Sequence, residues 1–192
     1  MFEGCTSLVN APSLSGLWWL SPGCFLNMFR GCTSLITAPE LPFTKLKEEC
    51  YMYMFWGCTN LITAPQLPAT TLAEYCYKEM FRECTSLVST PTLPATTFAK
   101  GCYFGIVYGT DLFPDISKID FSSSNSVLCG LFAGTKVTDT YLNNILPKNN
   151  NNKYYLPAES LTPSCYESMF EDCVFLNTAP ELPATSLTES CY

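Results

Sequence analysis

Residues 67–91 read LPATTLAEYCYKEMFRECTSLVSTP, and residues 41–65 read LPFTKLKEECYMYMFWGCTNLITAP. The two stretches agree position by position, and a Met-Phe pair stands near the centre of each. The same pair recurs at Met1-Phe2, Met28-Phe29, Met54-Phe55, Met80-Phe81 and Met169-Phe170. Weaker copies in the same register begin at Ile106 and Leu131. Such a period is the signature of stacked repeats, so the sequence predicts about seven copies of a unit of about 26 residues.

Each unit is expected to contain one short helix. Leu72, Cys76 and Met80 are spaced four residues apart, which would place them on one apolar helical face. Thr71 stands three residues before Glu74, and this spacing is typical of a capping box at the start of a helix. Ser186 and Glu189 repeat the arrangement.

The rest of each unit is expected to be a turn followed by a brief strand. Gly31 and Gly57 each stand two residues after the Phe of a Met-Phe pair, and glycine readily adopts the left-handed conformation that ends a helix. Residues 35–42 are short and extended in character. Pro39 and Pro42 cannot donate backbone hydrogen bonds, so the strand must be brief or loosely paired. No single unit can bury its apolar face, and neighbouring units must do so.

The predicted fold is therefore an α/β solenoid of about seven strand-plus-short-helix units, forming a single domain over residues 1–192. The strong repeats span 1–103 and 157–192, degenerate repeats span 104–142, and an Asn-rich insertion spans 143–156. Both ends of the sequence fall inside a unit without a polar capping copy. We therefore expect the chain to be an excerpt of a longer array. The alternative is that Met1 is an initiator methionine that coincides with the repeat methionine.

The motif GCTSL, followed by a short strand and Leu-Pro, resembles the BspA-like leucine-rich repeats of bacterial surface proteins. The resemblance covers the strong repeats well and the remainder weakly. It implies a leucine-rich-repeat module at the cell surface or in a secreted protein. Members of such a family serve in adhesion or interaction, typically without enzymatic activity.

The composition argues against several classes of function. The chain has a formal net charge of −7, only 14% charged residues and no histidine. A negative chain is a poor ligand for a phosphate backbone, so we expect no nucleic-acid partner. The absence of histidine removes the commonest general base and metal ligand. No apolar stretch is long enough to span a membrane. We expect no cofactor, no metal and no direct insertion into a membrane.

The twelve cysteines fall into two series that recur once per unit. One series lies in the expected helix (Cys24, Cys50, Cys76, Cys102, Cys165 and Cys191), and the other follows it (Cys5, Cys32, Cys58, Cys84 and Cys173). Their recurrence at inward positions favours buried free thiols. Bridges between adjacent units remain an alternative. Cys129 falls outside both series and is the one cysteine to watch for reactivity.

A polar face of the array is the first candidate for binding a partner. Equivalent repeat positions at the strand would present Thr37, Glu40, Thr63, Gln66, Ser89, Thr92, Thr178 and Glu181. A ladder of this kind suits contact with a protein or a glycan on another cell or in a host. The alternative is a solvated edge without a ligand.

Two departures from the repeat are further candidates. Trp18 and Trp19 break the pattern of the first unit, and tryptophan is enriched in binding hot spots. They could equally contact a neighbouring unit or an upstream capping segment. The insertion contains Asn150, Asn151, Tyr154 and Tyr155, and insertions in repeat arrays often lie on the binding face. The alternative is that the insertion is a low-complexity expansion that the fold tolerates.

We therefore expect a non-catalytic protein- or glycan-binding module. The alternative is a structural spacer that has no ligand of its own. A cysteine-dependent enzyme is a third class, and it would require a thiol with a depressed pKa.

Overall fold

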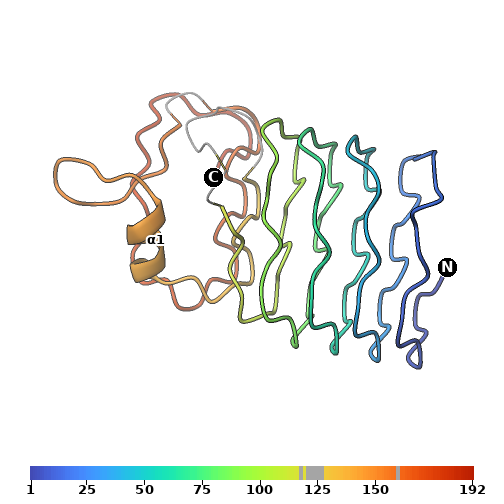
Figure 1. The fold of residues 1–192 in the computed structure, drawn as a ribbon. Coiled ribbons are helices and arrows are strands. Elements are labelled where there is room, and N and C mark those ends of the chain that lie inside the picture. Colours follow the sequence, from blue (N-terminus) through green and yellow to red (C-terminus); the bar gives the residue numbers. More distant parts are fainter. Residues whose placement is uncertain (117–118, 120–127, 159–160) are drawn as a thin grey trace.

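The computed structural model describes residues 1–116, 119, 128–158 and 161–192. We call each stretch of 25 or 26 residues that is hydrogen-bonded to the equivalent stretch beside it a pass. Successive passes lie side by side from the N-terminus onward, and helix α1 lies at the far end of the molecule from the N-terminus (Figure 1). Helix α1, Asp139–Ile145, is the only α-helix among the described residues. Strand pairing there is limited to isolated bridges, which are Asn10–Thr37, Thr37–Thr63, Lys45–Thr71, Thr71–Thr97, Thr92–Asp115, Lys148–Tyr154 and Tyr155–Glu181.

The predicted α/β solenoid is therefore wrong. Residues 74–81, which lie in the expected helix, form consecutive turns, and residues 35–42 contain a single bridge residue in place of a strand. The expectation of a leucine-rich-repeat architecture built from strand-plus-helix units falls with it. Thr71 does not cap a helix, since it forms bridges to Lys45 and Thr97.

The passes are joined by backbone hydrogen bonds that run sideways. The N–H of Phe25 donates to the carbonyl of Cys50 at 3.0 Å, whereas the N–H of Met28 donates back to Phe25 at 3.1 Å. Alternate residues thus bond to the next pass, and those between them close tight turns. In an α-helix the backbone N–H groups donate to carbonyls of the same segment. A helix here would therefore leave the carbonyls of the next pass without hydrogen-bond donors.

Left-handed residues make this arrangement possible. They recur at every fourth position, for instance at Asn27 with φ of 56° and at Gly31 with φ of 70°. Asn27 is the third residue of the four-residue turn from Phe25 to Met28, a position at which a type II turn requires a positive φ. The left-handed conformation expected at Gly31 and Gly57 is thus present, but it belongs to a run of turns and not to a helix end.

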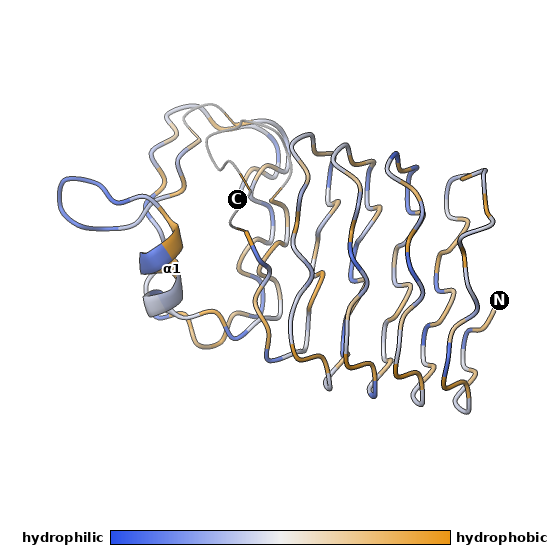
Figure 2. Cartoon of the chain, viewed as in Figure 1, coloured by the Kyte–Doolittle hydropathy of each residue, from blue (hydrophilic) through white to orange (hydrophobic). Residues whose placement is uncertain are grey.

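Stacked rings fill the interior. Phe29, Phe55 and Phe81 form one fully buried column with ring centroids 5.6 and 5.7 Å apart. Tyr51 and Tyr77 belong to a second column, 5.7 Å apart. Figure 2 shows the hydrophobic segments lining up from one pass to the next. Each pass therefore buries its apolar side chains against equivalent ones on its neighbours.

A row of cations and rings runs across the outside of these passes. The Arg30 guanidinium lies 4.0 Å from the Trp56 ring centroid, and Arg82 lies 4.7 Å from the same ring. Arg82 also lies 4.3 Å from the ring centroid of Tyr108. Cation–π contacts of this kind add lateral stability. The ring of Tyr108 lies directly against Gly134, where an added Cβ would come within 2.3 Å of it.

Helix α1 lies outside the segments for which the repeat pattern predicts a helix. Thr138 caps it by accepting a hydrogen bond from the N–H of Tyr141 at 3.3 Å, and Leu142 is its buried residue. The helix ends at Ile145, after which Leu146 is extended and Pro147 follows. The helical conformation is disfavoured for a residue that precedes proline, so the local sequence explains why the helix ends at Ile145.

Gly134→Ala is expected to destabilise the fold more than Gly31→Ala. Both glycines are left-handed, with φ of 64° and 70°, so both variants incur roughly 1–2 kcal/mol of backbone strain. Only at Gly134 does the new methyl group collide with a ring, whereas at Gly31 the nearest atom is 3.8 Å away. Overpacking adds about 1–3 kcal/mol. Urea unfolding of the two variants measures the difference, and equal losses would refute the packing of Tyr108 on Gly134.

Candidate functional site

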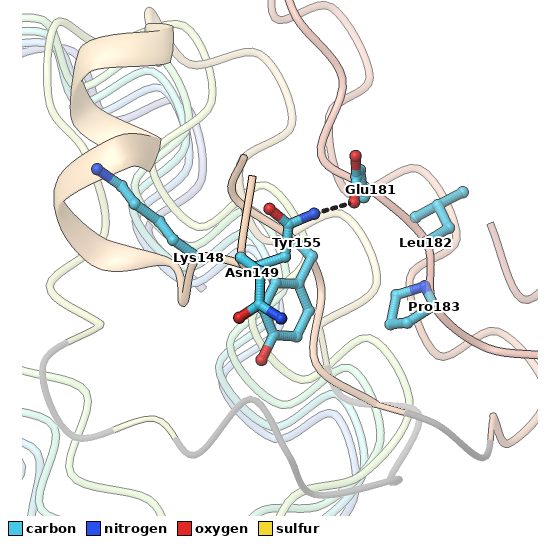
Figure 3. A pocket seen from close by; sticks show the side chains of 7 residues that line it. Lys148, Asn149, Tyr155, Glu181, Leu182 and Pro183 are labelled. Carbon is cyan, nitrogen blue, oxygen red and sulfur yellow. Dashed lines mark hydrogen bonds between the residues drawn. The ribbon is translucent and has the colours of Figure 1, made fainter. Parts of the chain in front are cut away.

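A pocket of about 550 Å³ opens between the Asn-rich insertion and the last pass of the chain. We call it the insertion pocket. Its lining residues are Lys148, Asn149, Asn150, Tyr155, Glu181, Leu182 and Pro183. Figure 3 shows Asn149 and Tyr155 facing Glu181, Leu182 and Pro183, while Lys148 extends away from Glu181. Glu181 and the insertion, which the sequence proposed as separate candidates, thus meet in one place.

Glu181 is fixed by both its backbone and its side chain. Its N–H donates to the carbonyl of Tyr154 at 3.0 Å, and its own carbonyl accepts from the N–H of Leu156 at 3.0 Å. The Asn149 amide donates to one carboxylate oxygen, and the Lys153 ammonium lies 3.6 Å from the other. The carboxylate is therefore held by two groups of the insertion.

Asn149 also organises the loop itself. Its side-chain oxygen accepts the N–H groups of Asn151 at 2.9 Å and of Lys153 at 3.0 Å. Its N–H donates to the carbonyl of Lys153 at 2.9 Å, and Asn152 is left-handed with φ of 61°. The sequence reasoning singled out Asn150 and Asn151 and missed Asn149. The available signal was that an asparagine side chain readily bonds the N–H two residues further on.

Asp139 attaches α1 to the last pass. One of its oxygens accepts the N–H of Thr178 at 2.8 Å and the hydroxyl of Tyr154 at 3.0 Å. The other accepts the N–H of Asn177 at 3.0 Å. These bonds, led by the one from the Asn177 backbone, hold the pKa of Asp139 well below its ordinary value of 3.8. Tyr154 is buried, and its single hydroxyl hydrogen is shared between Asp139 and the carbonyl of Thr178. Thr178 and Tyr154 therefore hold the insertion in place and do not line the insertion pocket.

The other residues of the predicted polar face lie away from the insertion pocket. Thr37 and Thr63 are exposed and bridge to each other through the backbone. Glu40 and Gln66 line a shallow groove of about 270 Å³ between two passes, with Pro39, Pro65 and Pro68 beside them. Ser89 and Thr92 are exposed, and Thr92 bridges to Asp115.

Trp18 and Trp19 belong to the N-terminal segment of the chain, and this segment lies at the opposite end of the molecule from α1 (Figure 1). They are 88% and 73% exposed. Among the described residues, packing of these two rings on a neighbouring unit is not seen.

The sequence reasoning missed a row of exposed aliphatic side chains on the predicted polar face. Val9, Ile36, Ile62 and Val88 occupy equivalent positions in four successive passes, and all four are exposed. Their alternation with the buried Leu35, Leu61 and Leu87 was the available signal.

The thiols show no sign of activation. The described cysteines form no disulfide, and only Cys5 and Cys24 are exposed. Burial raises the pKa of Cys58 to about 12 and that of Cys129 to about 11. Cys129 is thus buried and poorly ionised, contrary to what its position outside both series suggested. No disulfide joins the described cysteines, so the alternative of bridges between adjacent units is not seen.

Ligand sets for a metal and spans for a membrane were sought in the same part of the chain. No group of three or more Cys, Asp or Glu side chains among the described residues is placed to hold a metal ion. In those residues, too, no helix has the length and hydropathy that a membrane crossing requires.

Comparison with known proteins finds no match, whether with a family model, a curated protein or a solved structure.

Asp139→Asn is expected to lower stability near neutral pH and to flatten its dependence on acid. The folded pKa of Asp139 is lowered, so its stabilising effect is present above the ordinary pKa of 3.8 and is lost as the pH falls below it. Thermal unfolding of both proteins between pH 3 and 7 tests this. The difference in Tm should be largest at pH 7 and shrink toward pH 3, and a constant difference would show that the lowered pKa is wrong.

Thiol labelling should separate the cysteines by burial. At pH 8 a disulfide reagent is expected to label two thiols of the native chain rapidly and all twelve after denaturation. Cys5 should react before Cys24, since burial raises the pKa of Cys24. Mass spectrometry of the labelled peptides identifies the sites. Rapid native labelling of Cys129 would contradict the burial described above.

Proposed function

We propose that this chain is a non-catalytic binding module of a cell-surface or secreted protein, and that it binds a glycan in the insertion pocket. The observation behind this proposal is that the lining of the pocket divides into polar and apolar side chains. Asn149, Asn150 and Glu181 supply the polar groups, and Tyr155 and Leu182 supply apolar surface.

A sugar ring matches this division. It presents C–H groups on its faces, which pack on an aromatic ring, and hydroxyl groups around its edge, which pair with amides and carboxylates. Tyr155 is half-buried and held by the bridge to Glu181, so little conformational freedom is lost when a ligand packs on it. A volume of about 550 Å³ lies within the range of small-ligand sites.

A protein partner would need a broader contact than this pocket offers, about 800 Å² on each side. A glycan chain could enter at one or two sugars and leave the remainder in solvent. The resemblance to BspA-like surface proteins agrees with a surface or secreted location and remains part of the proposal.

The thiols support a role without catalysis. A cysteine nucleophile needs a base or a lowered pKa, and burial raises the pKa of thiols such as Cys58 and Cys129. A spacer without a ligand is the competing proposal, and it is distinguished by the outcome of a binding experiment.

A screen of the purified chain on immobilised neutral and acidic glycans tests the proposal. The best glycan, measured next in solution, should lose at least tenfold in affinity with Tyr155→Ala, equivalent to about 1.4 kcal/mol. Tyr155→Phe should retain most of the affinity, because the ring remains.

Glu181→Gln should also weaken binding, whereas Glu40→Gln should not. Glu40 occupies the equivalent position on another pass and lies outside the insertion pocket. Retention of every glycan by the Tyr155→Ala and Glu181→Gln variants would refute this site. Failure to retain any glycan would favour the spacer.

A further inference from the structure

Four exposed aliphatic side chains form a straight row across successive passes. Val9 is 44% exposed, Ile36 is 40%, Ile62 is 45% and Val88 is 70%. We call them the aliphatic row. Side chains of this size are usually buried, and an exposed contiguous set of them marks an interaction surface.

Backbone hydrogen bonds hold the aliphatic row in register. The N–H of Ile36 donates to the carbonyl of Val9 at 3.1 Å, Ile62 donates to Ile36 at 3.2 Å, and Val88 donates to Ile62 at 3.2 Å. Passes joined in this way are spaced about 4.8 Å apart, so the row is ~14 Å long. Its members are fixed by the backbone and are not the tips of mobile loops.

The surroundings of the aliphatic row are almost free of charge. Residues 5–22, 31–44, 57–73 and 84–99 contain Glu40 as their only charged side chain, although the whole chain has a net charge of −7. The row is bordered by hydroxyl and amide groups. One border is formed by Ser34, Asn60 and Ser86, and the other by Thr37, Thr63 and Ser89.

We propose that this face is the contact surface between two copies of the chain. Two chains of equal negative charge repel each other, and a face without charge is where they meet at the least electrostatic cost. A two-fold axis perpendicular to the row, between Ile36 and Ile62, lays the row antiparallel on itself. Ile36 then meets Ile62 of the second copy, and Val9 meets its Val88. The polar borders meet equivalent borders, so the face is self-complementary, as a two-fold contact requires.

The dimer formed in this way is weak. A stable interface buries about 800 Å² on each partner, and four partly exposed aliphatic side chains supply only part of that area. Association at micromolar or higher concentrations is therefore expected. It should strengthen with added salt, because salt screens the repulsion between the two chains beyond about 10 Å at 0.1 M.

Sedimentation of the purified chain between 5 μM and 1 mM tests this proposal, which does not depend on glycan binding. The expected result is a concentration-dependent dimer whose association constant rises between 20 and 300 mM salt. Ile62→Lys should weaken the dimer at least tenfold, because each substitution occurs twice in the contact and places an uncompensated charge there.

Leu187→Lys is the matched control, since Leu187 is also an exposed aliphatic residue but lies outside the row. It should leave the dimer unchanged, and the thermal unfolding of both variants should resemble that of the parent. A chain that stays monomeric up to 1 mM overturns the proposal. So does a dimer that Ile62→Lys leaves intact, because another surface, or another partner for the row, would then be responsible.

Discussion

The fold depends on the sideways hydrogen bonds that alternate backbone N–H groups make to the next pass. The Phe25 N–H reaches the Cys50 carbonyl, and Tyr51 reaches Cys76 in the same way. Only a left-handed residue at every fourth position turns the chain so that these donors point outward from their own segment. Several of these positions are glycine, which adopts a positive φ at no steric cost. Others, such as Tyr75 with φ of 52°, are strained and are held by the bonds on either side.

Several of the buried positions were predictable from the sequence, but the secondary structure that joins them was not. Leu72, Cys76 and Met80 are all buried, as a helical face requires. Over eight residues, however, a period of 3.6 and a period of 4 place the same side chains inward, so burial alone could not distinguish a helix from a run of turns. Gly101, Gly105 and Gly109 did contain the distinguishing signal. Three glycines four residues apart cost a helix about 1 kcal/mol each, whereas a run of turns uses each of them at a positive φ.

The candidate site was predictable in its parts and not in its assembly. Asn150, Tyr155 and Glu181 were named from composition and repeat position, and they line one pocket. Their convergence depends on Asn149 and Asp139, whose hydrogen bonds join segments more than thirty residues apart. A single sequence contains no information on such pairs. The exposure of Ile36 and Ile62 could not be predicted for a different reason. A single exposed isoleucine is common on protein surfaces, and it indicates an interaction surface only when equivalent side chains are known to lie beside it.

The register of the sideways bonds also explains why the insertion is tolerated where it occurs. Elsewhere in the turn segments the bonded residues are 25 or 26 apart, as in Gly105 to Gly130. From Gly130 to Glu167 the separation is 37, and Phe132 to Met169 and Gly134 to Glu171 keep the same value. The additional residues leave the alignment of the two passes unchanged, because all of them are accommodated outside the hydrogen-bonded segments. The loop around Asn149 can therefore vary in length and composition at little cost to the stacked core. A pocket formed there can change the residues that the insertion contributes without changing the register of the stacked passes.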